Sequence, residues 1–461
     1  MFSAQTYFSR RATLQQSLTA GIILLLGNEE SPMNYSDNCF RFRQDDNFLY
    51  YFGLDMPHLA GIIDIEENSA ILFGEERTID DVVWMGPQPA LSELAARVGV
   101  FNVQAFENLA PFLQNYKAKN RPIHFLPPYR SENSIRLFQW LGIPFEKQRA
   151  EASELLIKAI VRQRAYKSAE EIAEIEKAVN TTGKMHIAAM QAAKPGMTEA
   201  ALAGLMEGIA ISGAGALSYP AILTINGQTL HNHFHGNTLQ SRQLVLADVG
   251  AETAMHYAGD ITRTFPVDKT FSSRQKDIYM LVLDTELKAI AAAAPGVSYL
   301  DVHLMAARNI AAGLKNLGLM QGDTEEAVQE GAHALFFPHG LGHMLGLGVH
   351  DMEDLGENYV GYSNTIQRSS QFGLKSLRLA RTLEPGFVLT VEPGIYFIPQ
   401  LIELWQQEGK FKAFINYEQL ESWKDFGGIR VEDNVLVTAT GQRVLGDPIP
   451  KTIPEIETLR A

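Results

Sequence analysis

Residues 244–266 read LVLADVGAETAMHYAGDITRTFP and place two carboxylates, Asp248 and Asp260, in consecutive apolar, strand-like runs. An ionised carboxylate in an apolar environment is costly unless a positive partner lies beside it. Two strands that turn near AETAM would set the aspartates roughly opposite each other, within reach of one cation. The alternative is that both residues cap turns at strand ends. The stretch therefore predicts a β-hairpin whose two acids either share a cation or cap its ends.

Composition limits the partners of the chain. Of its 461 residues, 46% are hydrophobic and 20% are charged, which is typical of a globular protein of two or three domains. The 39 basic and 53 acidic residues give a net charge of -14, which argues against nucleic acid or a membrane as partner. No apolar run approaches the roughly 20 residues that a membrane helix needs. The single cysteine, Cys39, excludes an intrachain disulfide and a thiolate cluster, and it predicts a cytoplasmic protein.

Two domains are expected from the order of the elements. Residues 1–150 alternate short apolar strands with helical stretches, an α/β pattern, and GIILLLG at 21–27 is typical of a buried first strand rather than a signal sequence. Ser168 then begins a long helix with the capping-box sequence SAEE. We therefore predict an N-terminal domain over residues 1–165 and a second domain over residues 166–461.

The second domain contains a weak internal repeat. AAKPGMTEAAL at 192–202 and AAAPGVSYLDV at 292–302 each join one predicted helix to the next. LVLADVG at 244–250 is echoed by VLTVEPG at 388–394, since each is an apolar strand that ends in an acid and a glycine turn. Two related halves that face each other would bring these acids to one site; the alternative is that the few matches arise by chance.

A histidine cluster follows in FFPHGLGHMLGLGVHD, residues 336–351, which contains His339, His343 and His350. Four glycines make a regular helix improbable there, so we expect extended or looped backbone. His339 and His343 have the spacing of a helical zinc pair, but the glutamate of the H-E-x-x-H pattern is absent. A lone histidine is usually a core residue, whereas three on one glycine-rich segment indicate a site.

Two further apolar strands carry acids. FVLTVEPGIYF places Glu392 at the end of a β-type run, and FGGIRVEDNVLV places Arg430 and Glu432 on one face of a strand. Asp433 points the other way. Taken alone, the second strand could hold an ordinary surface ion pair. Four acids in or beside apolar strands, together with histidines and no usable thiol, indicate instead an oxygen-rich site for manganese, cobalt, iron or zinc. Their charge suffices for two divalent ions.

These motifs, in their order and spacing, resemble the pita-bread metallopeptidases, specifically aminopeptidase P and prolidase. DNCFRFRQDDNFLYYFGL at 37–54 is similar to the N-terminal domain of aminopeptidase P. The resemblance implies an α/β (α+β) protein in which an N-terminal α/β domain precedes a creatinase/aminopeptidase-like catalytic domain with pseudo-twofold halves. It also implies an Xaa-Pro aminopeptidase that contains two divalent metal ions, foremost Mn²⁺ with Co²⁺ or Zn²⁺ as alternatives.

The resemblance also implies roles for individual residues. The implied metal ligands are Asp248, Asp260, His343, Glu392 and Glu432. Asp260 and Glu432 would bridge the two ions, and Glu392 would also relay a proton. The implied catalytic histidines are His350 and His231, although His233 and His235 compete for the second place. The implied substrate-binding residues are His339, Arg378 and Arg430. The interval between the two aspartates is one residue longer than is common in the family, so the hairpin tip is expected to bulge.

The C-terminal part resembles prolidases more than aminopeptidase P. SLRLARTLEPG at 376–386 is similar to the prolidase segment whose first arginine, here Arg378, holds the free carboxylate of a dipeptide. The long segment at 401–428 is prolidase-like too. Arg378 could equally pair with Glu384 or another structural acid. The alternative activity is therefore an Xaa-Pro dipeptidase restricted to dipeptides.

Three rival functions follow from the same fold. They are a binding module that has lost catalysis, a metal-free creatinase-like amidinohydrolase, and a methionine aminopeptidase. The complete ligand set disfavours the first two, and the large N-terminal domain disfavours the third. The expected partners are small peptides with proline in the second position, and the expected assembly is a homodimer or homotetramer.

Overall fold

The structure is a computed structural model that describes residues 1–461. It divides into two compact units, residues 1–164 with 352–359 and residues 165–351 with 360–461. No sequence pattern indicated that the segment at 352–359 belongs with the first unit. The domain assignment of 1–165 and 166–461 stays a prediction. No helix combines the length and the apolar character that a bilayer crossing requires.

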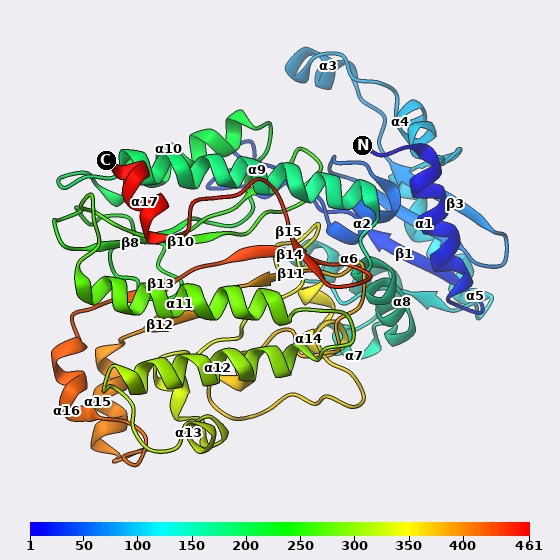
Figure 1. Cartoon of the computed structure of the whole chain (residues 1–461). Coiled ribbons are helices and arrows are strands. Elements are labelled where there is room, and N and C mark those ends of the chain that lie inside the picture. Colours follow the sequence, from blue (N-terminus) through cyan, green and yellow to red (C-terminus); the bar gives the residue numbers. More distant parts are fainter. The chain divides into compact units, whose positions relative to one another are not determined.

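The first unit is an α/β fold (Figure 1). Its helices are α1 (Ala4–Gln16), α2 (Asp46–Phe52), α3 (Ile79–Met85), α4 (Leu91–Arg97), α5 (Leu109–Ala118), α6 (Ser131–Leu141), α7 (Gln148–Glu151), α8 (Glu154–Ala165) and α14 (Glu357–Val360). Its strands are β1 (Ile22–Leu26), β2 (Ala60–Asp64), β3 (Ser69–Gly74), β4 (Asn102–Ala105) and β5 (Ile123–His124).

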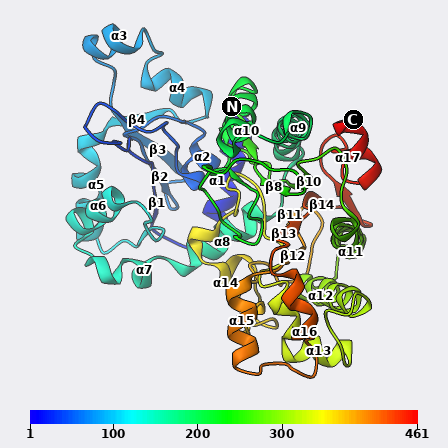
Figure 2. The same cartoon turned by 90° about the vertical axis from the view of Figure 1, so that its left-hand side faces the viewer.

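The sheet of the first unit has the order β4-β3-β2-β1-β5. Its central strand pairs are antiparallel, while β5 and β4 add parallel strands at the two edges. Alternate apolar residues of β1 to β3 pack against α5 and α6, which cover one face of the sheet (Figure 2). Four of the five residues of β1 are buried, which confirms GIILLLG as a buried strand.

The second unit contains several small sheets and flanking helices. Its helices are α9 (Ala169–Ala192), α10 (Glu199–Ser212), α11 (Ser273–Ala292), α12 (Tyr299–Asn316), α13 (Thr324–Glu330), α15 (Pro399–Gln407), α16 (Tyr417–Leu420) and α17 (Ile453–Arg460). Its strands are β6 (Ala216–Leu217), β7 (Ile222–Thr224), β8 (Leu244–Asp248), β9 (Ala251–Glu252), β10 (Thr262–Pro266), β11 (Val388–Val391), β12 (Gly394–Tyr396), β13 (Gly428–Arg430), β14 (Asp433–Val437) and β15 (Gln442–Val444).

The predicted repeat corresponds to two helix pairs. Helices α9 and α10 pack against each other, as do α11 and α12 (Figure 1). The turn between each pair contains a glycine of positive φ, Gly196 at 87° and Gly296 at 84°, where an L side chain would be strained. The capping box is also confirmed, because the Ser168 side chain accepts from the Glu171 amide and the Glu171 side chain accepts from the Ser168 amide.

The predicted hairpin forms, and its two aspartates are close but not directly opposite. β8 and β10 are antiparallel, with Asp248 opposite Thr262, two residues beyond Asp260. Asp260 precedes β10, so the two aspartates are diagonal neighbours on one face instead of direct partners. The tip closes through a hydrogen bond from the Thr253 amide to the Tyr257 carbonyl, with His256 at a positive φ of 65°. The small strand β9 within this connection pairs with β6.

Candidate metal centre

One pocket of the second unit has a volume of about 590 Å³ and lies among the ends of β8, β10, β11 and β13. The residues that the sequence predicted for the site all line it: His231, Asp248, Asp260, His339, His343, His350, Arg378, Glu392, Arg430 and Glu432. Of the two histidines that competed with His231, His233 also lines the pocket. The structure therefore brings together side chains from both halves of the unit.

The two hairpin aspartates share a tyrosine. The Tyr219 hydroxyl lies 2.6 Å from Oδ1 of Asp248 and 2.5 Å from Oδ1 of Asp260. Both carboxylates are buried, with at most 9% of either residue exposed. The backbone of Asp260 is held as well, because Asn434 accepts from its amide at 3.0 Å and donates to its carbonyl at 2.5 Å. The acids of the hairpin are thus fixed side by side and do not act as turn caps.

His343 reaches the aspartates from the glycine-rich segment. Its Nε2 lies 3.3 Å from Oδ2 of Asp260 and 3.6 Å from Oε1 of Glu392. The segment runs beside β11 without forming a regular element, as expected, and the His343 amide donates to Oγ1 of Thr390. A Cβ on Gly342 would lie 2.0 Å from the carbonyl oxygen of Thr390, so only glycine permits this approach.

Glu432 completes the group of donors. One donor atom from each of Asp260, His343 and Glu432 lies within 4.8 Å of the others. Oε2 of Glu432 accepts from the Thr262 hydroxyl at 2.7 Å, whereas its Oε1 is buried and has no hydrogen-bond partner. A buried carboxylate oxygen without a partner is uncommon, because the lost hydration is not replaced.

Arg430 links the carboxylate donors to a series of hydrogen bonds that continues through Tyr396 to His339. Its guanidinium donates to Oδ2 of Asp248 at 2.5 Å, to the Tyr396 hydroxyl at 2.6 Å and to the Thr262 hydroxyl at 3.1 Å. The Tyr396 hydroxyl in turn lies 2.9 Å from Nε2 of His339. Arg430 and Glu432 share the pocket face of their strand, as predicted. A substrate-binding role for Arg430 stays a prediction, since these contacts are with the protein itself.

The pocket concentrates negative charge. Burial raises the pKa of Asp248, raises that of Glu392 to about 7, and raises that of Glu432 well above its ordinary value. Repulsion from neighbouring carboxylates adds to each of these shifts. Burial would also raise the pKa of Asp260, but the hydrogen bond and charge of His343 outweigh it and lower the pKa.

This donor set fits divalent metal ions. Three buried carboxylates and the partly buried Glu392 face two arginines and one well-placed imidazole, so the carboxylates outnumber the arginines. Hard oxygen donors with one imidazole suit Mn²⁺, Co²⁺, Fe²⁺ or Zn²⁺. The buried Oε1 of Glu432 offers an acceptor that a cation would satisfy.

The remaining predicted residues lie around the donors. The rings of His350 and His343 meet edge to face with centroids 4.2 Å apart. His231 lies in an irregular segment, and burial lowers its pKa. Arg378 lines the pocket, while Glu384, its possible structural partner, pairs with Arg381 at 3.1 Å.

Three polar residues of the site escaped the sequence analysis. Thr262 could have been found, because strand alternation from Asp260 places it on the same face. Tyr219 and Tyr396 carry no such signal, since each belongs to an apolar stretch and meets its partners only in the folded unit. An aromatic residue in an apolar run is ordinarily a core residue.

Comparison with known proteins agrees with this geometry. A family model described as metallopeptidase family M24 matches residues 173–439, and one described as aminopeptidase P, N-terminal domain, matches residues 7–124. The human Xaa-Pro dipeptidase is 33% identical over 454 residues, which cover 95% of this chain and 88% of that protein. A probable Xaa-Pro aminopeptidase of Uncinocarpus reesii is 30% identical and covers 95% of this chain and 90% of its own.

Solved structures give the same result. Aminopeptidase PepP of Pseudomonas aeruginosa superimposes with a TM-score of 0.81 at 29% identity, over 99% of this chain and 98% of that one. The fold and site thus define a metal-dependent hydrolase with a pita-bread catalytic unit. The chain belongs to metallopeptidase family M24, with an aminopeptidase P N-terminal domain. The predicted family, fold class and enzyme class are confirmed.

Proposed function

We propose that the protein is an exopeptidase dependent on two metal ions that hydrolyses the bond between an N-terminal residue and a following proline. The observation that carries this proposal is the convergence of four carboxylates, three of them buried, and His343 in one pocket of about 590 Å³. Relatives named Xaa-Pro dipeptidase and Xaa-Pro aminopeptidase support the substrate class. A structure of Escherichia coli aminopeptidase P holds the inhibitor Pro-Leu, which supports a peptide ligand.

The proposed metal ligands come from both halves of the catalytic unit. They are Asp248, Asp260, His343, Glu392 and Glu432. We propose residues 166–461 as the catalytic domain and residues 1–165 as the N-terminal domain. Mn²⁺ is the proposed native ion because carboxylate oxygens dominate the donor set, with Co²⁺ and Zn²⁺ as alternatives. Reconstituting metal-free protein with each ion in turn, and comparing kcat/KM, tests this choice.

The chemistry needs an activated water, a stabilised oxyanion and a proton for the leaving group. Two bound divalent ions would supply a water acidic enough to attack at neutral pH and would polarise the scissile carbonyl. His231 and His350 line the pocket and are proposed to donate hydrogen bonds to the carbonyl oxygen as charge develops on it. Glu392 is proposed to pass a proton to the departing proline nitrogen. His339 and Arg430 are proposed to orient the peptide.

A second candidate is an Xaa-Pro dipeptidase. Arg378 lines the pocket and offers a cation for the free carboxylate of a dipeptide, which a longer peptide would carry further away. The experiment compares an Xaa-Pro dipeptide with an Xaa-Pro-Yaa tripeptide on manganese-loaded protein. Arg378→Ala is the test variant, and Arg381→Ala is the control because Arg381 pairs with Glu384 and does not line the pocket.

The outcomes separate the two activities. Preference for the dipeptide, lost in Arg378→Ala and kept in Arg381→Ala, establishes the dipeptidase. Comparable hydrolysis of both peptides establishes the aminopeptidase. Hydrolysis of neither by metal-loaded protein would overturn the proposed function. We also propose a homodimer or homotetramer in the cytoplasm, which light scattering on the purified protein and fractionation of cells test directly.

A further inference from the structure

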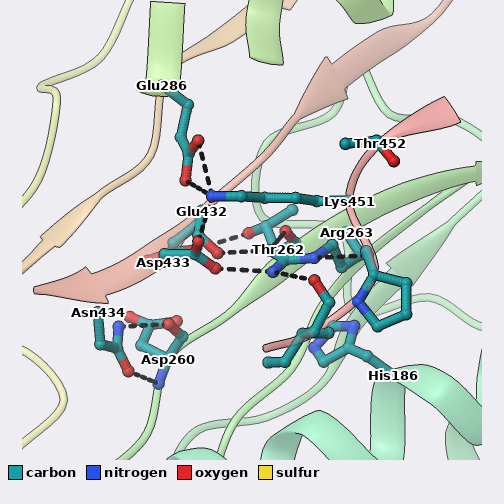
Figure 3. A network of polar contacts seen from close by, with 12 residues as sticks. His186, Asp260, Thr262, Arg263, Glu286, Glu432, Asp433, Asn434, Lys451 and Thr452 are labelled. Carbon is teal, nitrogen blue, oxygen red and sulfur yellow. Dashed lines mark hydrogen bonds and ion pairs between the residues drawn. The ribbon is translucent and has the colours of Figure 1, made fainter. Parts of the chain in front are cut away.

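A second polar cluster lies directly behind the pocket, on the opposite face of the same strands. Strand alternation points Asp260 and Thr262 into the pocket and Arg263 away from it, and it separates Glu432 from Asp433 in the same way. Figure 3 shows Arg263 and Asp433 meeting on this far face. We name this group, Arg263, Glu286, Asp433 and Lys451, the rear network. None of its four members lines the pocket.

Lys451 is the centre of the rear network. Its Nζ lies 2.8 and 3.0 Å from the two carboxylate oxygens of Glu286 and 2.5 Å from Oδ2 of Asp433 (Figure 3). Glu286 comes from α11, whereas Lys451 precedes α17. The side chain of Glu286 has no exposed surface, so removing the ammonium would leave a carboxylate buried without its charge partner.

Arg263 carries the contact on to the pocket strands. Its Nη2 donates to Oδ1 of Asp433 at 2.7 Å, while its Nη1 donates to the backbone carbonyls of Thr262 at 3.0 Å and Glu432 at 2.7 Å. Nε and Nη2 also reach the carbonyls of Pro450 and Ile449. One guanidinium thus joins the two pocket strands to the segment that contains Lys451.

The Asp433 carboxylate is held from both sides, by Lys451 on one oxygen and by Arg263 on the other. Its peptide neighbour is Glu432, whose side chain enters the pocket. Fixing the Asp433 side chain and the Glu432 carbonyl therefore fixes the direction in which the Glu432 carboxylate points. Partners that orient a metal ligand from behind typically change metal affinity or activity tenfold to a hundredfold when they are removed.

We propose that Lys451 is a positioning residue for the metal centre, acting through Asp433 on Glu432. This inference rests on the proposed function, because it takes Glu432 to be a metal ligand. With Lys451 present, the rear network is charge-balanced, with two acids and two bases. Without it, only Arg263 holds the Asp433 carboxylate. Asp433 can then rotate, and the Glu432 carboxylate is no longer held in the orientation that metal binding requires.

A merely structural role for Lys451 would be to dock the C-terminal helix. That role has a matched control, because Lys276 pairs at 2.9 Å with Glu457 of α17 rather than with a member of the rear network. Replacing Lys276 by methionine weakens helix docking and leaves the chain of contacts to Glu432 intact. The two lysines therefore separate docking from positioning.

The experiment uses the full-length protein with Lys451→Met, Lys451→Arg and Lys276→Met. The readouts are the Mn²⁺ dissociation constant from competition with a chelating indicator, and kcat and KM for an Xaa-Pro peptide. Lys451→Met is expected to weaken Mn²⁺ binding and lower kcat, each by about tenfold to a hundredfold, with KM within about twofold of wild type. Lys451→Arg should restore both, since it keeps the charge and the donors. Lys276→Met should match wild type.

A second variant tests the inference even if Lys451→Met fails to fold. Glu286→Gln keeps a side chain of the same size and touches Lys451 and Asp433 without lining the pocket, so it should shift Mn²⁺ affinity and kcat in the same direction by a smaller factor. The inference is overturned if Lys451→Met and Glu286→Gln bind Mn²⁺ like wild type, or if Lys276→Met is impaired as much as Lys451→Met. Wild-type protein that binds no Mn²⁺ would instead overturn the proposed function, and the inference with it.

Discussion

The pocket and the rear network hold buried acids on the two faces of the same strands, but they balance the charge differently. In the rear network, Glu286 and Asp433 meet Arg263 and Lys451, so every carboxylate has a cation within hydrogen-bond distance. In the pocket, four carboxylates face two arginines and His343, and a buried oxygen of Glu432 has no partner. Acids that the chain neutralises itself hold the fold together, whereas acids it leaves unbalanced are available to a cation.

The largest expected effect follows from removing a carboxylate of the pocket. Asp260→Ala removes a carboxylate that lies beside both His343 and Asp248, so metal binding and catalysis should both fail. We expect kcat/KM to fall at least a thousandfold, which is about 4 kcal/mol of transition-state stabilisation. Metal analysis of the purified protein and peptide hydrolysis measure the result. Asp284→Ala, an exposed acid on α11, is the control, and full metal content in Asp260→Ala would contradict the assignment.

The next largest effect is expected when a cation of the rear network is removed. Arg263→Met removes one partner of a buried ion pair with Asp433. It also removes the hydrogen-bond donors to four backbone carbonyls. The free energy of unfolding of the metal-free protein should drop by about 3–5 kcal/mol. Glu432→Gln should not lower it, because burial and the neighbouring carboxylates already oppose ionisation of Glu432 and the amide has the same size. Urea unfolding of the chelator-treated protein compares the two, and equal losses would show that the faces do not differ.

A smaller effect concerns His186, which lies below Arg263 in Figure 3. Burial, and then the charge of Arg263, lower the pKa of His186 to about 3. Below the ordinary pKa of histidine, about 6.5, His186 is protonated in the unfolded chain but stays neutral in the folded protein. Stability therefore falls as the pH falls from about 6.5 towards 3. At pH 5 this amounts to about 2 kcal/mol.

His186→Gln should remove this dependence. The variant is expected to lose less stability than wild type between pH 7 and pH 5, and urea unfolding at the two pH values measures the difference. Carboxylates that titrate in this range contribute equally to both proteins and cancel in the comparison. Identical pH dependence in the two proteins would mean that His186 is protonated in the folded state.

The smallest effect is expected where an ion pair lies at the surface. Lys288 and Asp284 pair at 2.7 Å on α11, and both side chains are more than half exposed. Water screens such a pair, so Lys288→Met should change the free energy of unfolding by less than about 0.5 kcal/mol. A change as large as that of Arg263→Met would mean that burial does not set the strength of these pairs.

Local sequence patterns predicted much of the fold. The capping box at Ser168 and the buried strand at 22–26 depend on nearest neighbours in the chain, and both formed as expected. Strand alternation placed Arg430 and Glu432 in the pocket and Asp433 behind it, because the side-chain period of a strand is fixed by its backbone.

Contacts that depend on the whole fold could not be predicted from the sequence. The exact register of the hairpin, in which Asp248 lies opposite Thr262, was not predictable, because turn length and packing set it and the pattern of apolar residues does not. Tyr219 and Lys451 meet the hairpin acids and Asp433 only after distant segments pack together. Eight of the ten pocket residues stood out in the sequence patterns themselves, whereas His231 and Arg378 came from the family resemblance.

The division of the donors between two halves of the chain has a consequence for the order in which the site can arise. The hydrogen bond between Arg430 and Asp248 joins positions that are 182 residues apart. A nascent chain that has reached α12 already contains both hairpin aspartates but none of the later donors. It has no cavity in which a metal ion could activate water, so hydrolytic activity cannot precede completion of the second half. The long separation also makes closure of the site a late event in folding.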